Sequence, residues 1–136
     1  MKYLLDVNVL NALCVREHVF HERVGSWMNE SARADRAELM TCALTELGFL
    51  RILVQAPWYS FTIEQGVQLL SRLKSSGDFR FGFLTDGLGI AQLPRSVKGA
   101  KQIADRHLVE LAKSHGATLA TLDENIQSAM VIPNSR

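Results

Sequence analysis

The sequence predicts an α/β fold, a three-layer α/β/α sandwich around a central, mostly parallel sheet of four or five strands. Short apolar runs alternate along the chain with stretches in which apolar residues recur every three or four positions, as strands alternate with helices. The run Tyr3–Leu5 is continuous, which suits a parallel strand covered on both faces, and Thr118–Leu122 repeats this arrangement. Right-handed crossovers then place all strand ends that lead into helices on one side of the sheet.

The composition favours one compact domain spanning residues 1–136. Hydrophobic residues make up 47% of the chain, and the formal net charge of +1 provides no global basic field for binding nucleic acid. No apolar run approaches the ~18 residues of a membrane span, and no secretion signal opens the chain. Cys14 and Cys42 stand far apart, without metal-binding spacing, which suits a reducing compartment. We therefore expect a cytoplasmic protein.

The N-terminal stretch places a carboxylate where the first strand ends. Asp6 directly follows the apolar run Tyr3–Leu5, and Asn8 is a good N-cap for a helix through Leu13. Ligands of open α/β sheets bind beyond the carboxyl ends of the strands, so Asp6 is a candidate site residue. The alternative is that Asp6 merely caps the helix, since Asp is among the favoured caps.

The next elements repeat the pattern with a glutamate. Apolar spacing predicts a helix over Glu17–Asn29, and Glu38–Thr41 reads as a short strand. Thr45 is a plausible N-cap of a following helix that reaches Leu53. Glu46 lies in its first turn, either as a favourable partner of the helix dipole or as a second carboxylate facing the crevice of Asp6.

The second half of the chain supplies two more acids. A helix is predicted over Ile63–Lys74 and a strand over Phe79–Leu84, followed by an irregular segment from Gly87 to Gly99. Helical spacing returns from Gln102 and includes Asp105. The strand Thr118–Leu122 ends at Asp123, and Met130–Ile132 is a candidate edge strand.

Four carboxylates are thus expected at one edge of the sheet: Asp6, Glu46, Asp105 and Asp123. Without an interleaved Lys or His they would repel one another and raise each other's pKa values. A hard divalent cation relieves this repulsion, and Mg²⁺ or Mn²⁺ suits an oxygen-only ligand set better than zinc. Such an ion supports phosphoryl transfer, so the residues favour a metal-dependent phosphoryl or phosphodiester hydrolase.

The same motifs resemble those of the PIN domain, and in particular the VapC-type ribonuclease toxins of bacterial toxin–antitoxin modules. The resemblance covers LLDVNVLNAL, TCALTELGFLRIL and QIADRHLVELAKSHGATLATLDENI. It implies that the four carboxylates are the metal-site and catalytic residues, with Asn8 supporting the first. It also implies Mg²⁺- or Mn²⁺-dependent RNA cleavage, inhibition of translation, a homodimer and a cognate antitoxin that inserts a segment near the site. Two positions depart from the family pattern, Ala104 where Ser or Thr is frequent and Ile126 where an aromatic is frequent.

Three basic residues offer phosphate contacts beside the predicted site: Arg95, Lys98 and Lys101. A solvated surface is the alternative for this cluster.

Two other functions remain open from the residues alone. One is a non-catalytic module whose acidic crevice receives a basic segment of a partner. The other is a metal-dependent phosphatase, which the presence of Asn8 instead of a second Asp makes less favourable.

Overall fold

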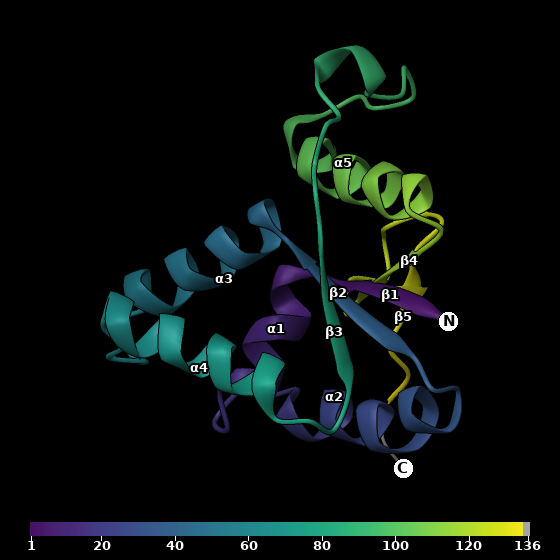
Figure 1. Ribbon diagram of the computed structural model, residues 1–136. Coiled ribbons are helices and arrows are strands. Elements are labelled where there is room, and N and C mark those ends of the chain that lie inside the picture. Colours follow the sequence, from purple (N-terminus) through teal and green to yellow (C-terminus); the bar gives the residue numbers. More distant parts are fainter. Residues whose placement is uncertain (135–136) are drawn as a thin grey trace.

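A computed structural model describes residues 1–134 of the chain (Figure 1). Its centre is a five-stranded sheet of order β3-β2-β1-β4-β5, in which every neighbouring pair is parallel. The strands are β1 (Lys2–Leu5), β2 (Glu38–Cys42), β3 (Arg80–Leu84), β4 (Thr118–Thr121) and β5 (Met130–Val131). The predicted α/β class and the parallel sheet are confirmed.

The central strand β1 is buried because both of its faces are apolar. Leu4 pairs in register with Met40 of β2 and Leu119 of β4. Leu4 and Leu5 have no exposed surface, and they point to opposite faces of the sheet because side chains alternate along a strand. The chain therefore builds one core on each side of β1.

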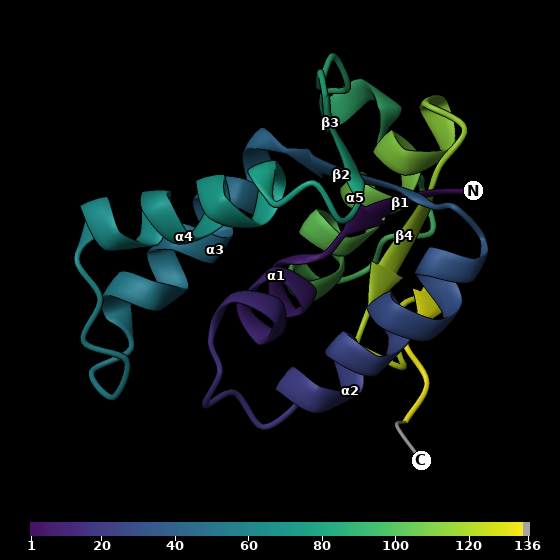
Figure 2. The same ribbon diagram turned by 60° about the horizontal axis from the view of Figure 1, so that its bottom comes forward.

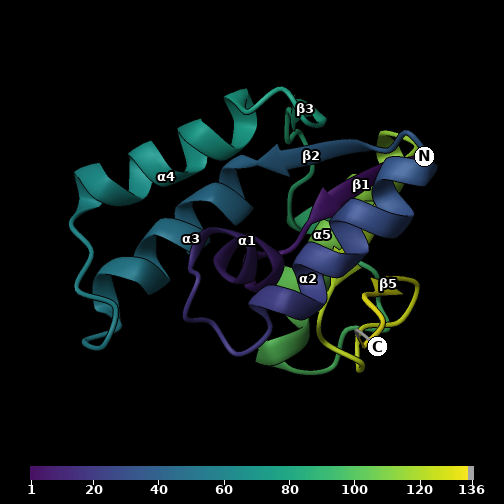
Figure 3. The same ribbon diagram turned by 90° about the horizontal axis from the view of Figure 1, so that it is seen from below.

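Helices cover the two faces unequally. The helices α1 (Val7–Cys14), α2 (His21–Trp27), α3 (Ala43–Gln55) and α4 (Ile63–Ser75) enclose the core that contains Leu5. A single helix, α5 (Ala100–Ser114), covers the core that contains Leu4 (Figure 1). Seen from below, α1 lies between α3 and α2 (Figure 3). This arrangement is the predicted three-layer sandwich.

The pair α3 and α4 projects beyond the sheet (Figure 2). The two helices approach closely at Gly66 of α4, where a Cβ atom would lie 2.6 Å from Leu50 Cδ1 of α3. A side chain at this position would require the Leu50 side chain to shift. The close approach leaves a groove between α3 and α4 that ends near the carboxyl edge of the sheet.

Several predicted boundaries were wrong. The helix expected over Glu17–Asn29 is α2 followed by one π-helical turn, Met28–Ala32, and residues before His21 form turns. Helix α1 begins at Val7 with Asp6 as its N-cap, so Asn8 lies inside the helix. Helix α3 begins at Ala43, and the irregular segment before α5 contains a 3₁₀ turn, Ile90–Gln92. None of the described helices is long and apolar enough to cross a membrane.

Candidate functional site

Three aspartates meet where the strands β1 and β4 end. Asp6 directly follows β1, Asp123 lies two residues beyond β4, and Asp105 is on α5. The backbone N–H of Asp6 donates to the carbonyl of Ala120 at 3.0 Å, which holds the ends of the two strands together. The order of the sheet therefore gathers residues from both ends of the sequence at one edge.

Asp6 is the most enclosed of the three, with 6% of its surface exposed. Its Oδ1 accepts from the backbone N–H of Val7 at 2.8 Å, and its Oδ2 accepts from the Thr121 hydroxyl at 2.7 Å. Burial raises the pKa of the Asp6 carboxyl, the two hydrogen bonds lower it, and the charge of Asp123 raises it further. Asp6 is thus both the helix cap and a buried acid, so the two interpretations of this residue are compatible.

Asp105 and Asp123 complete a mutually repelling set. Burial raises the pKa of Asp105, and the charges of Asp6 and Asp123 raise it further. Asp123 Oδ1 accepts from the backbone N–H of Asn125 at 2.9 Å, which fixes its orientation in the turn after β4. Among the ion pairs of residues 1–134, none includes Asp6, Asp105 or Asp123.

Thr121 organises the site, and it was not predicted from the sequence. Its buried hydroxyl donates to Asp6 and accepts from the backbone N–H of Asp123 at 3.1 Å and from Asn8 Nδ2 at 3.4 Å. Asn8 in turn accepts from the backbone N–H of Leu122 at 3.3 Å. Asn8 therefore lies beside the first carboxylate, as expected, but reaches it through Thr121. In the sequence Thr121 is one position of an apolar strand, and no local signal distinguishes it.

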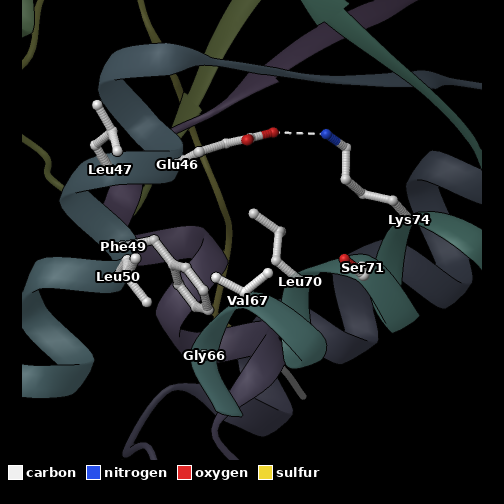
Figure 4. Close-up of a pocket in the computed structure, with 9 residues that line it drawn as sticks. All are labelled: Glu46, Leu47, Phe49, Leu50, Gly66, Val67, Leu70, Ser71 and Lys74. Atoms are coloured by element: carbon white, nitrogen blue, oxygen red, sulfur yellow. Dashed lines mark hydrogen bonds and ion pairs between the residues drawn. The ribbon is translucent and has the colours of Figure 1, made fainter. Parts of the chain in front are cut away.

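Glu46 is bonded to residues other than the three aspartates. One of its oxygens, Oε2, accepts from the Thr41 hydroxyl at 2.6 Å and from Lys74 Nζ at 2.5 Å (Figure 4). The four carboxylates were expected to meet without an interleaved lysine, whereas Lys74 is paired with the fourth.

The three predicted phosphate-binding residues lie on the segment that enters α5. Arg95, Lys98 and Lys101 are exposed, and within residues 1–134 none of them forms an ion pair. Arg106 differs from them, because it contacts Glu110 at 3.6 Å and donates to the carbonyl of Gln127 at 3.1 Å. Arg106 thus ties α5 to the loop after β4.

The two departures from the family pattern are accommodated differently. Ile126, where an aromatic was expected, is buried and packs in the core beneath α5. Ala104, where a hydroxyl was expected, is exposed and leaves Asp105 without a hydroxyl from the preceding residue. The loop after β4 is therefore anchored by packing, and the orientation of Asp105 depends on α5 itself.

The donor set fits a hard divalent cation in its chemistry. The side chains of Asp6, Asp105 and Asp123 offer only carboxylate oxygens as ligands. A cation would neutralise their negative charge and so relieve their repulsion. As the side chains stand, no three Asp, Glu, His or Cys residues among positions 1–134 are close enough to hold an ion together. The cluster therefore has the charge and the ligand type that a hard cation requires, but its side chains are not arranged here as a three-ligand metal site.

Comparison with known proteins adds three findings. A family model described as the PIN domain matches residues 3–130. Ribonuclease VapC44 of Mycobacterium tuberculosis is 34% identical over 129 residues, which cover 93% of this chain and 89% of that protein. Ribonuclease VapC29 of the same organism is 35% identical over 130 residues, with the same coverage of both chains.

Two solved structures share the fold. The crystal structure of Mycobacterium tuberculosis VapC20, described as a sarcin-ricin loop cleaving toxin, superposes with a TM-score of 0.65 at 13% identity and covers 98% of this chain and 99% of its own. Rickettsia felis VapBC2, bound to a DNA fragment of its promoter, gives a TM-score of 0.60 at 13% identity, covering 96% and 97%.

Proposed function

The chain belongs to the PIN domain family and resembles its VapC-type ribonucleases over most of its length, and from this premise we propose that residues 1–136 form one Mg²⁺- or Mn²⁺-dependent endoribonuclease domain. Its role is that of the toxin in a toxin–antitoxin module, where RNA cleavage inhibits translation in the cytoplasm. The observation that carries this proposal is the convergence of Asp6, Asp105 and Asp123 at the carboxyl edge of the sheet.

Each residue of the site has a proposed role. Asp6, Asp105 and Asp123 would hold the cation, and Glu46 would serve as a fourth acidic group. When held by these residues, a divalent cation would supply Lewis-acid polarisation of a phosphoryl oxygen and activation of water. Thr121 fixes one oxygen of Asp6 and orients Asp123 through its backbone N–H. Burial of Asp6 excludes water from one side of the site.

The proposal is tested by cleavage of a panel of transfer RNAs and structured RNAs with protein freed of any partner. We expect cutting with Mg²⁺ or Mn²⁺ and none with EDTA, because the cation supplies the charge that stabilises the transition state. Cutting that persists in EDTA would contradict the metal requirement. A folded protein that binds the cation but cuts nothing would favour the non-catalytic acidic-crevice module.

Lys98 and Lys101, together with Arg95, are proposed to contact RNA phosphates beside the acidic cluster. Their exposure and their position at the start of α5, which carries Asp105, support this role. Replacing Lys98 and Lys101 together with Glu is expected to lower RNA affinity and to flatten its dependence on salt, since fewer counterions are released. Salt titrations of RNA binding measure both, and an unchanged slope would remove these residues from the interface.

A cognate antitoxin and a second copy of the chain are the proposed protein partners. Helix α3 exposes four large apolar side chains, more than a helix packed on one side needs: Leu44, Leu47, Ile52 and Val54. We assign this surface to the homodimer. Light scattering of the purified chain measures its molar mass, and a monomer at all concentrations would contradict the assignment.

A further inference from the structure

A polar pocket adjoins the acidic edge of the sheet, between α5 and the loop that follows β4. Asp105 and Arg106 of α5 line it on one side, and residues 125–128 line it on the other. Its volume is about 350 Å³, within the roughly 300–1,000 Å³ of small-molecule sites. The pocket is therefore large enough for a small organic group.

Both walls of this pocket are connected to the aspartates at the strand ends. Asp105 itself lines the pocket from α5. On the opposite side Asn125 lines it, and the backbone N–H of Asn125 donates to Asp123 Oδ1 at 2.9 Å. A group bound in the pocket would thus lie next to two of the three aspartates.

The loop wall is held in one conformation. Ile126 is buried and packs in the core beneath α5, and Arg106 donates to the carbonyl of Gln127 at 3.1 Å. Ser128 has a φ of 66°, in the left-handed region that residues other than glycine seldom adopt unless their surroundings impose it. Such strain is concentrated at functional sites, and its presence here indicates a pocket that is formed before a ligand arrives.

The lining offers both donors and acceptors of hydrogen bonds. The side chains of Asn125 and Gln127 are free amides, because within residues 1–134 the hydrogen bonds of these two residues use only backbone atoms. Gln102 adds an N–H donor, since its Oε1 already accepts from the backbone N–H of Lys98 at 2.9 Å. Arg106 carries five N–H groups, and only one forms a hydrogen bond in the described chain. This mixture matches the edge of a nucleobase, which presents donors and acceptors side by side.

Other ligands fit the same lining less well. A phosphate would meet the Asp105 carboxylate, and the charge of Arg106 is opposed by Glu110 at 3.6 Å. A metal ion would find one carboxylate, because Asp105 is the only acidic residue among the described residues that line the pocket. A nucleobase is neutral, and it can stack on the planar guanidinium of Arg106 or pack against the apolar Ile126.

We propose that this pocket binds one unstacked nucleobase of single-stranded RNA beside the bond that is cleaved. Ser96 also lines the pocket, and it lies between the exposed Arg95 and Lys98, which are the proposed phosphate contacts. Phosphate contacts position the strand but carry no sequence information, so the pocket would select the base at one position. This inference rests on the proposed function, because it names the feature of the RNA that the same site reads.

The test is binding of fluorescently labelled RNA, measured by anisotropy in EDTA so that recognition is separated from cleavage. The strands are of equal length and abasic throughout, except for a central nucleotide that carries A, C, G, U or no base. Wild type is expected to bind at least one base-bearing strand roughly 5-fold more tightly than the fully abasic strand, the effect of about one net hydrogen bond. The variant Asn125→Ala/Gln127→Ala is expected to lose this preference and to keep its affinity for the abasic strand.

The control variant is Gln68→Ala, which removes an exposed amide from α4 and should retain the wild-type preference. The two substitutions in the pocket leave the backbone bonds to Asp123 and Arg106 in place. Circular dichroism checks that each variant is folded, and Gln127→Ala alone would replace a double variant that is not.

Three results would overturn the proposal. Wild type that binds the base-bearing and abasic strands equally, or binds none of them, has no base site. A preference that survives in the double variant places the base elsewhere. An equal loss of affinity for every strand in the double variant would assign the two amides to the RNA backbone.

Cleavage by the same wild-type preparation with Mg²⁺ tests the proposed function separately. A protein that cuts RNA but shows no base preference would refute the pocket alone. A protein whose base preference depends on Asn125 and Gln127 but which never cuts RNA would refute the nuclease and support the pocket.

Discussion

Asp6→Asn is expected to reduce metal-dependent RNA cleavage by on the order of 10³-fold, equal to several kcal/mol of lost transition-state stabilisation. The substitution removes the charge of the most buried carboxylate of the site. Asparagine keeps the shape of the aspartate side chain, and its side-chain amide oxygen can still accept from the backbone N–H of Val7 at the start of α1. The measurement is the initial rate of cleavage of the responsive RNA at saturating Mg²⁺.

The same variant should be more stable than wild type when metal is absent. The pKa of Asp6 is raised above 3.8 in the folded chain, so the folded state binds more protons than the unfolded state as pH rises from 3.8 through that raised value. The free energy of unfolding of wild type therefore falls across that range and stays lower at neutral pH, whereas the uncharged amide of Asp6→Asn causes no such loss. Urea unfolding in EDTA, at neutral pH and below pH 3.8, measures the difference.

Asp78→Asn is the matched control for both measurements. Asp78 is exposed in the turn between α4 and β3, so its loss should leave cleavage and stability near wild type. A wild-type cleavage rate in Asp6→Asn would contradict the assignment of this residue. An Asp6→Asn variant that unfolds would instead show that the charge is needed for the fold.

Thr121→Val is expected to lower the cleavage rate roughly 10- to 100-fold, as is typical when a group that orients a metal ligand is removed. Valine matches the shape of threonine but cannot donate to Asp6 Oδ2 or accept from Asn8 and the backbone N–H of Asp123. The free energy of unfolding should fall by about 1–3 kcal/mol, because buried polar groups lose their partner.

The pH profile of Thr121→Val distinguishes an effect on the site from simple loss of stability. The Thr121 hydrogen bond lowers the pKa of Asp6, so its removal raises that pKa and moves the acidic limb of the cleavage profile to higher pH. Thr121→Ser keeps the hydroxyl and should retain the wild-type profile. If Thr121→Ser lowers the rate as much as Thr121→Val, keeping the hydroxyl does not preserve the rate, and this result would contradict the assignment of the effect to the hydrogen bond.

The elements of the fold could be predicted from local patterns because each depends on its own sequence. The continuous run Tyr3–Leu5 becomes the fully covered centre of the sheet, and the strand–acid sequence recurs at Asp123. The first residues of the helices were harder to predict. Asp6 and Asn8 are both favourable N-cap residues, and only the backbone conformation shows that Asp6 precedes the first turn of α1. Thr45, expected as a cap, instead lies in the first turn of α3 and accepts from the backbone N–H of Cys42.

The candidate site was harder to predict where it depends on contacts between distant elements. Lys74 lies 28 residues from Glu46, and their ion pair follows from the packing of α4 against α3, for which a single sequence contains no local signal. Thr121 is surrounded by apolar residues and reads as an ordinary strand position. Its importance appears only when β4 lies beside β1 and the hydroxyl meets Asp6.

The pairing of β1 with β4 also determines when the acidic site can form during synthesis of the chain. Asp6 and Thr121 are 115 positions apart, so a ribosome releases the first long before it has synthesised the second. Until β4 emerges, the nascent chain lacks Thr121 and Asp123, and β1 has an unpaired edge. The acidic edge of the sheet therefore cannot form on a nascent chain until β4 has emerged and paired with β1.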